Sequence, residues 1–190
     1  NPVTDNATAI NYLQKFNSKN PVQVYPIGAL TQMSNGEHLA ELFDMKNAGA
    51  IAFGDFKEAT ENTNLLKIAL QYTKPFDGIV QSFPLDVSIA RTGYVNEGEE
   101  STSLGLKGIP NFAEELQIER DLTLLAYTEG KLHIPTISTK KSVELIKKAK
   151  KDGLDVSCSV AVHHIAYSDD KLRTFNANYK VLPPLRTKED

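Results

Sequence analysis

Several residue types and patterns are scarce in this sequence of 190 residues, and each scarcity excludes a class of protein. The single cysteine, Cys158, excludes an intramolecular disulfide framework and a zinc site made of several thiolates, and it fits a reducing cytoplasm. The 21 Lys and Arg residues do not outnumber the 24 Asp and Glu residues, so the charge predicts no nucleic-acid partner. The longest apolar runs are about five residues, against the roughly 20 that span a bilayer. We therefore expect a cytoplasmic protein that binds neither nucleic acid nor a membrane.

A cationic signal-peptide start is also missing from the sequence. The chain begins at Asn1 rather than at a methionine, which predicts a processed form or a fragment. Its composition, 41% hydrophobic and 24% charged, is that of a folded globular protein. Its length predicts a single domain over residues 1–190.

Short apolar runs alternate with longer helical patterns along the chain. Continuous apolar character, without polar alternation, is typical of strands that are buried on both faces of a parallel sheet. The expected fold class is therefore α/β, but the periodicity does not distinguish a doubly wound sheet from an arc of a (β/α)8 barrel. The predicted strands are Val22–Ile27, Ala50–Phe53, Gly78–Gln81, Leu132–Ile134 and Asp155–Val160.

The helical segments have recognisable start and stop signals. Asp5 or Asn6 is expected to cap the first helix, Ser138 or Thr139 the last, and Gly49 and Gly153 follow helix ends, where a left-handed residue is common. The predicted helices are Ala7–Asn17, a segment from Leu39 that ends at Asn47–Gly49, Leu65–Tyr72, Phe112–Thr128 and Val143–Lys151. The stretch Leu85–Pro110 interrupts this alternation and is predicted to be a functional or interface loop.

Residue spacing alone predicts no catalytic site. None of the four histidines forms an HxH or HExxH motif, and adjacent His163 and His164 would point to opposite faces of an extended chain, away from a common metal ion. Asp55 follows the predicted strand Ala50–Phe53, where α/β folds collect catalytic groups, but Asp is also common as a loop or cap residue. The lysines around Lys147 are typical of a solvated helix face.

Longer segments of the sequence resemble those of the dihydroorotase family. The stretch GYVNEGEESTSLGLKGIPNFAEELQIERDLTLLAYTEGKLHI, Gly93–Ile134, contains the combination NEGE, LGL, GIP, AEE and RD of that family's signature region. Segments upstream and downstream match that family in order and spacing: NPVTDN, VYPIGALT, LAELFDMKNAGAIAFGD, IST, VELIKKAKKDGLDVSCSV and PPLRTKED. The resemblance covers essentially the whole chain.

This resemblance implies part of the metal-dependent amidohydrolase (β/α)8 barrel, without its first and closing strands. For active members it implies the reversible cyclisation of carbamoyl aspartate to dihydroorotate, with zinc as the cofactor that activates a water. The family's HxH pair on the first strand and its Asp base on the eighth strand would lie outside residues 1–190. The family's acidic bridging position reads GDFK at residues 54–57, so Asp55 is the only retained ligand-like position and our only candidate metal ligand.

Two further ligand positions of the family depart from histidine. The resemblance places one on Ser82 and the other on Thr136, while His133 matches a family histidine that is not the usual ligand. The position of a substrate-contacting Asn is Leu182, and His163 and His164 match a pair with a structural or supporting role. Because Ser and Thr hydroxyls are poor zinc ligands, we expect no catalytic residue and no bound cofactor here.

These departures favour a non-catalytic homologue in pyrimidine biosynthesis. The resemblance implies a scaffold or partner subunit in a homo- or hetero-oligomer, with aspartate carbamoyltransferase as the partner. The alternatives are an active dihydroorotase that uses residues outside this chain and a small-molecule sensor. We also expect Glu97, Glu99 and Glu100 to organise their loop and the start of the helix that follows, with Gly98 in a left-handed turn and backbone donors bound to Glu99.

Overall fold

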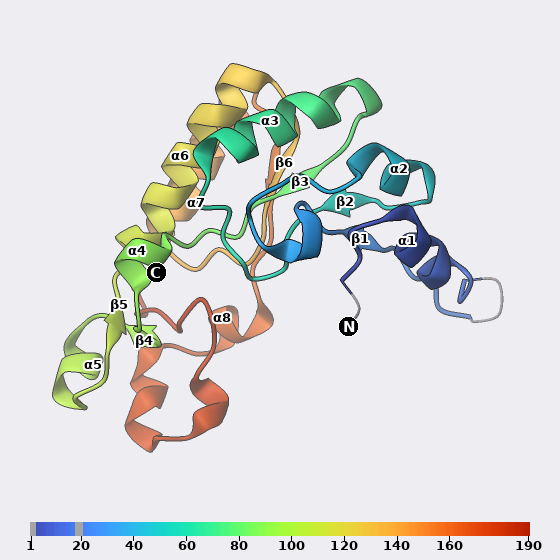
Figure 1. Ribbon diagram of the computed structural model, residues 1–190. Helices are drawn as coiled ribbons and strands as arrows, with labels where there is room; N and C mark the ends of the chain where they lie inside the picture. The colour runs from blue at the N-terminus through green and yellow to red at the C-terminus, as the bar shows by residue number, and fades with distance from the viewer. Residues whose placement is uncertain (1–2, 18–20) are drawn as a thin grey trace. The chain divides into compact units, whose positions relative to one another are not determined.

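The computed structural model describes residues 3–17 and 21–190 (Figure 1). Asn1 and Pro2, which open the word NPVTDN, lie outside the described residues. The chain divides into two compact units: the first contains residues 1–83 and 123–133, and the second contains residues 84–122 and 134–190. Helix α6 (Phe112–Thr128) and strand β6 (Leu132–Ile134) have residues in both units and match the predicted bounds.

The first unit contains a parallel sheet whose strands are ordered β1, β2, β3 and β6. The strands are β1 (Ile27–Gly28), β2 (Ala52–Phe53) and β3 (Val80–Gln81), and the registers pair Ile27 with Ala52, Phe53 with Val80, and Val80 with Leu132. The prediction of a strand from Val22 is wrong up to Pro26. Pro26 has no N–H to donate, and Val22, Val24 and Tyr25 are exposed instead of packed.

The three predicted helices of the first unit are present, but the first ends at Gln14 instead of Asn17 and the second begins at Leu42 instead of Leu39. They are α1 (Ala7–Gln14), α2 (Leu42–Asn47) and α3 (Thr63–Thr73), with the short 3-10 helices η1 (Gln32–Ser34) and η2 (Lys74–Phe76). The Asn6 side chain caps α1 by accepting the Ala9 N–H at 3.0 Å, and Gly49 follows α2 with φ 105°. The apolar side of α3 is buried, and Phe53 of β2 is the largest fully buried side chain of this core.

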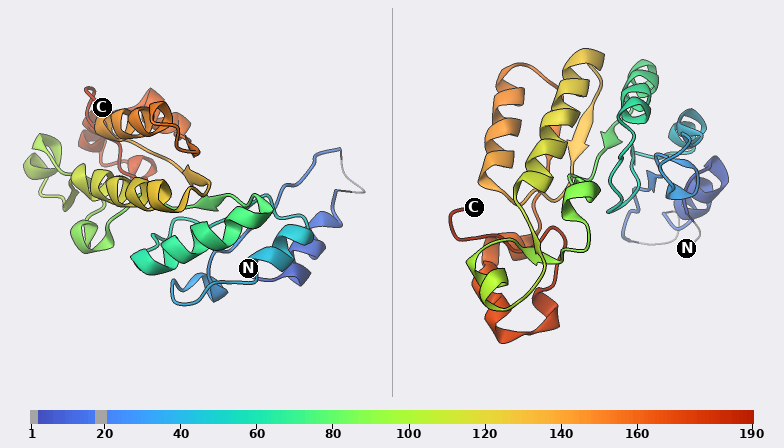
Figure 2. Two further views of the ribbon diagram at one scale, coloured as in Figure 1. Left: turned by 90° about the horizontal axis from the view of Figure 1, so that it is seen from above. Right: turned by 60° about the vertical axis from the view of Figure 1, so that its left-hand side comes forward.

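The second unit contains the start of α6, helix α7 and strand β7. Its elements after β6 are α7 (Lys140–Lys151), β7 (Val156–Cys158), α8 (Val162–Ala166), η3 (Asp169–Thr174) and η4 (Ala177–Tyr179). The two long helices α6 and α7 lie side by side (Figure 2), and Lys141 of α7 forms ion pairs with Glu115 and Glu119 of α6 at 3.7 and 3.4 Å. The other lysines of α7 are exposed, as a solvated face predicts.

The stretch Leu85–Pro110 is not a long loop, so that prediction is wrong. It folds into α4 (Val87–Ala90), β4 (Val95–Asn96), α5 (Glu99–Ser103) and β5 (Gly108–Ile109), and the two strands pair in parallel. The elements are too short to produce a readable period. Glycine at position 93 permits the close approach of this segment to Gly108. A Cβ on Gly93 would lie 2.5 Å from the Gly108 carbonyl oxygen.

The expected left-handed turn at Gly98 is also wrong, because its φ is 174°, an extended conformation. The Ser101 hydroxyl accepts the Gly98 N–H at 3.0 Å at the start of α5, and the Glu100 carboxylate binds Arg173 of η3. In the described part of the chain, no helix is long and apolar enough to cross a membrane.

Candidate functional site

Asp55 lies directly after β2 in the first unit, and its carboxylate binds the loop that follows β1. Oδ1 accepts the backbone N–H groups of Leu30 at 2.9 Å and Thr31 at 3.1 Å, and Oδ2 accepts the Thr31 hydroxyl at 2.5 Å. Asp55 and Thr31 are both buried. Both carboxylate oxygens therefore already bind the protein, and this geometry gives Asp55 a loop-ordering role.

Ser82 follows β3 in the same unit, at the position where the resemblance expects a histidine ligand. Its backbone N–H donates to the His133 carbonyl at 3.1 Å and extends the β3–β6 pairing. The side chain is fully buried, and no group in residues 3–17 and 21–190 forms a hydrogen bond with its Oγ. The hydroxyl of Ser82 is a buried polar group left without a partner, which costs free energy of folding.

We therefore expect Ser82→Ala to raise the free energy of unfolding by about 1 kcal/mol, because alanine removes the unpartnered hydroxyl and leaves no large cavity. Urea denaturation of the full-length protein measures the change. Ser138→Ala is the matched control, since the Ser138 hydroxyl accepts from Arg186 Nε at 3.0 Å and its loss should destabilise. A destabilised Ser82→Ala variant would show that this hydroxyl has a partner in the protein.

Thr136 occupies the other expected histidine position and lies in the second unit, just after β6. Its N–H donates to the Ser159 hydroxyl at 3.2 Å. Its φ of 57° is rare for a β-branched residue, so the backbone is strained at this position. His133, the retained histidine in β6, is half-buried, and burial lowers its pKa below the ordinary value.

The residues at these three positions do not fit a zinc centre. Zinc sites use imidazole, thiolate or free carboxylate donors, whereas Ser82 and Thr136 supply hydroxyls and the Asp55 carboxylate already accepts three hydrogen bonds. Over the residues that the structure describes, His, Cys, Asp and Glu form no group of three that could hold a metal ion.

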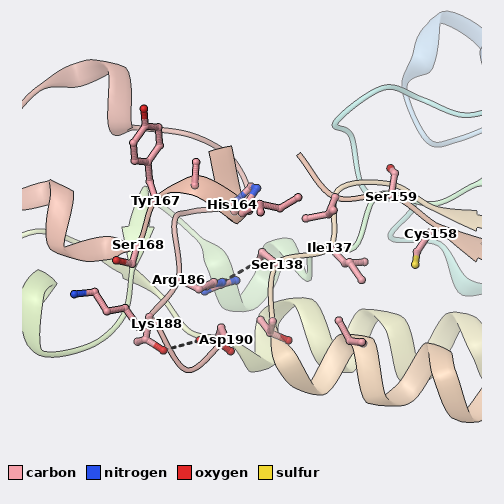
Figure 3. Close-up of a pocket in the computed structure, with 16 residues that line it drawn as sticks. Ile137, Ser138, Cys158, Ser159, His164, Tyr167, Ser168, Arg186, Lys188 and Asp190 are labelled. Atoms are coloured by element: carbon pink, nitrogen blue, oxygen red, sulfur yellow. Dashed lines mark hydrogen bonds between the residues drawn. The ribbon is translucent and has the colours of Figure 1, made fainter. Parts of the chain in front are cut away.

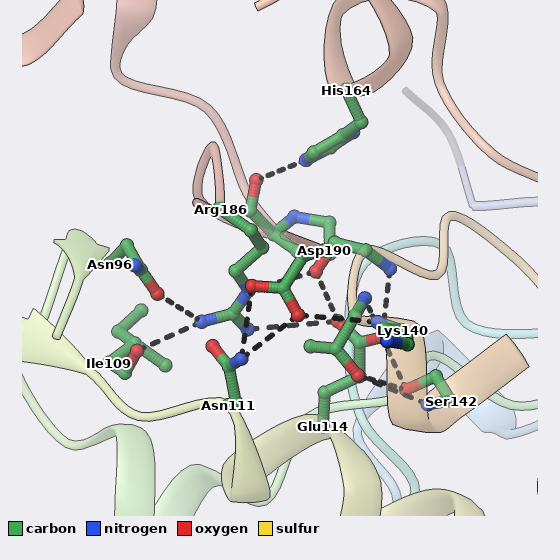
Figure 4. Close-up of polar contacts among 12 residues, drawn as sticks. Asn96, Ile109, Asn111, Glu114, Lys140, Ser142, His164, Arg186 and Asp190 are labelled. Carbon is green, nitrogen blue, oxygen red and sulfur yellow. Dashed lines mark hydrogen bonds and ion pairs between the residues drawn. The ribbon is translucent and has the colours of Figure 1, made fainter. Parts of the chain in front are cut away.

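A buried ion pair in the second unit was not predicted as a site. Arg186 and Glu114 are both buried, with 3.7 Å between Arg186 Nη2 and Glu114 Oε2 (Figure 4). Arg186 Nη1 also donates to Asn96 Oδ1 at 2.9 Å and to the Ile109 carbonyl at 3.0 Å. Burial lowers the pKa of the Arg186 guanidinium, and the Glu114 carboxylate opposes that shift. The pair joins the C-terminal segment to α6 and to both short strands.

Glu114 also organises the start of α7. Its Oε1 accepts the N–H groups of Ser138 at 2.8 Å and Thr139 at 3.1 Å and the Ser142 hydroxyl at 2.7 Å, while Oε2 accepts the Ser138 hydroxyl. The Thr139 side chain caps α7 by accepting the Ser142 N–H at 3.1 Å. One carboxylate thus holds both the guanidinium and the residues that begin the helix.

A cavity of about 720 Å³ adjoins this cluster in the second unit (Figure 3). Its walls come from the residues after β6 and β7, from α8 and from the C-terminal segment, and they include Ser138, Ser159, His164, Tyr167, Arg186 and Asp190. His163 and His164 lie in α8 and not on an extended strand, so the expectation that they point to opposite faces is wrong: their ring centroids are 4.4 Å apart.

Comparisons with known proteins agree with the resemblance read from the sequence. The model of the family described as dihydro-orotase-like matches residues 1–142. Proteins named dihydroorotase from Acetivibrio thermocellus and Pelotomaculum thermopropionicum are each 43% identical to this chain and match all of it, over 45% and 44% of their own lengths.

Solved structures support the fold. The L-hydantoinase from Arthrobacter aurescens superposes with a TM-score of 0.79 at 20% identity, over 99% of this chain and 43% of that one. A D-hydantoinase from a Bacillus species gives a TM-score of 0.72 at 16% identity, over 95% and 42% of the two chains. The predicted fold class, α/β and part of a (β/α)8 barrel, is thereby confirmed.

This chain spans a little under half the length of the dihydroorotases that it matches. The family model covers most of its residues, including the signature region Gly93–Ile134 that suggested the family. The chain therefore belongs to the dihydro-orotase-like family of amidohydrolases.

Proposed function

We propose that this chain is part of a dihydroorotase-like protein of pyrimidine biosynthesis that has lost zinc-dependent catalysis and acts as a scaffold or partner subunit. The observation that supports this most is the set of contacts of Asp55. The only ligand-like carboxylate binds two backbone N–H groups and a hydroxyl of its own unit, and hydroxyl side chains replace imidazoles at Ser82 and Thr136. The chain thus retains the fold of the family but not the side chains that would bind zinc.

The proposed partner is aspartate carbamoyltransferase, in a hetero-oligomer in which the barrel contributes binding surface and no active site. Both the partner and the oligomer are inferred from the family resemblance. In this proposal, the hydrogen bonds that Asp55 and Arg186 form with residues distant in the sequence keep each unit rigid. A rigid surface without catalytic groups is what a scaffold subunit requires.

The alternative is an active dihydroorotase whose metal ligands come from outside residues 1–190. The observation that favours it is the 43% identity to two proteins named dihydroorotase. In that case, the water-activating chemistry of zinc would be supplied by ligands that this chain does not contain.

Three measurements on the full-length protein test the proposal. We expect no dihydroorotase turnover above the buffer rate and no stoichiometric zinc in elemental analysis. We also expect co-elution with aspartate carbamoyltransferase at equimolar concentration, at the mass of a complex by light scattering. Stoichiometric zinc with measurable turnover would establish the active alternative, and separate elution of the two proteins would refute the scaffold role.

A further inference from the structure

The imidazole pair of α8 has an unusual environment in the second unit. The rings of His163 and His164 are in contact, with centroids 4.4 Å apart and an interplanar angle of 46°. His163 Nε2 and His164 Nδ1 are both buried, and neither forms a hydrogen bond with any group in the described residues. Two polar ring nitrogens are thus enclosed without partners.

The hydrogen bond of the His164 ring to Pro183 indicates which ring nitrogen carries the proton. His164 Nε2 lies 3.0 Å from the Pro183 carbonyl oxygen, which only accepts, so Nε2 carries the proton (Figure 4). In the neutral ring, Nδ1 then has a lone pair and needs no acceptor. Protonation of His164 would place an N–H at the buried Nδ1, which forms no hydrogen bond within the described residues.

The charged groups around the pair do not supply a free counter-ion. Glu114 of α6 is bound to Arg186 and to the start of α7, and Lys188 and Asp190 of the C-terminal segment line the same cavity as His164. Asp190 in turn accepts hydrogen bonds from Asn111 and Thr187. Around His163, the titratable groups are Tyr167 and Tyr179, which line a second cavity of about 300 Å³ with it.

The partner of His164 belongs to the segment that contains the buried arginine. Pro183 lies three residues before Arg186, whose carbonyl oxygen accepts the Asp169 N–H at 2.8 Å and whose guanidinium binds Asn96 and Ser138. We propose that the contact between His164 and Pro183 is acid-sensitive: protonation of His164 separates α8 from residues 181–186 and weakens the attachment of the C-terminal segment in the second unit.

The direction of the pH effect follows from burial. Desolvation lowers the pKa of His164 below 6.5, and the nearby His163 adds to this, while the Pro183 hydrogen bond and Glu114 oppose it. A folded-state pKa below the unfolded value means that the unfolded chain binds more protons. The stabilisation is therefore complete above about pH 6.5 and decreases as the pH falls from there towards the folded-state pKa.

Three variants of the full-length protein test this inference. His164→Gln keeps an N–H donor for the Pro183 carbonyl but cannot become charged, and His163→Phe keeps an aromatic ring against His164 while it removes the neighbouring imidazole. His38→Gln is the control, because His38 is exposed in the first unit. Urea and thermal denaturation between pH 5 and 8 give the stability profiles, and hydrogen exchange corrected for intrinsic rates gives the protection of residues 181–188.

We expect the Tm of the wild-type protein and of His38→Gln to fall by about 2–5 °C more between pH 7.5 and 5.5 than that of His164→Gln. His163→Phe should show an intermediate fall. Protection at residues 181–188 should decrease in acid in the wild type and not in His164→Gln. His133 titrates in the same direction in every variant, so its effect cancels in these differences. Parallel pH profiles for the wild type and both α8 variants, or acid loss of protection in His164→Gln, would overturn the inference.

Discussion

Glu114→Ala is expected to lower the free energy of unfolding of the second unit by about 3–5 kcal/mol. The substitution leaves the buried Arg186 guanidinium without its counter-charge. It also removes the acceptor of the Ser138 and Thr139 N–H groups, which lie 2.8 and 3.1 Å from Oε1. Each of these losses leaves a polar group without a partner, and an unpaired buried charge is the more costly of the two. Urea denaturation followed by circular dichroism measures the change.

Glu144→Ala is the matched control, because Glu144 is an exposed glutamate of α7 and its loss should change stability by less than about 0.5 kcal/mol. A second variant separates the ion pair from the helix start. Arg186→Met together with Glu114→Leu replaces both charges by apolar groups and should be less destabilised than Glu114→Ala alone. If Glu114→Ala lowers the free energy of unfolding by no more than Glu144→Ala does, the ion pair does not stabilise the attachment of the C-terminal segment.

The parts of the fold that could be predicted are those with a long local signal. Helix α6 has the predicted bounds, Phe112–Thr128, because its apolar residues recur over 17 positions. The predicted strand at Val22 and the predicted loop at Leu85–Pro110 are wrong because elements of two to five residues give too few positions for a period. There, pairing between distant residues decides the structure.

In the candidate site, too, local patterns could be predicted from the sequence, whereas contacts between distant residues could not. Asp55 could be singled out because it follows a strand, but its partners Leu30 and Thr31 are 25 and 24 residues away, so no local pattern indicates its contacts. The words AEE and PPLR contain Glu114 and Arg186, yet nothing local indicates that these two side chains meet. A charged residue in the first turn of a long helix and an arginine after two prolines are each ordinary on a surface. Only their burial distinguishes them.

Asp55→Ala is expected to lower the free energy of unfolding by about 2–4 kcal/mol, because the buried N–H groups of Leu30 and Thr31 lose their acceptor. Asp55→Asn should lose less than half of that amount. Its amide oxygen can still accept the two N–H groups, and its amide nitrogen can donate to the Thr31 hydroxyl oxygen. Glu58→Ala, at an exposed position three residues after Asp55, serves as the control.

The Asn variant distinguishes a loop-ordering carboxylate from a metal ligand. A ligand role requires the negative charge, so Asp55→Asn would then release zinc from the full-length protein while hydrogen bonding in the loop persisted. A loop-ordering role requires only acceptors in the correct places, so metal content should be the same in the wild type, Asp55→Asn and Glu58→Ala. Zinc that is present in the wild type and lost only in Asp55→Asn would assign Asp55 to a metal centre and reject the non-catalytic proposal.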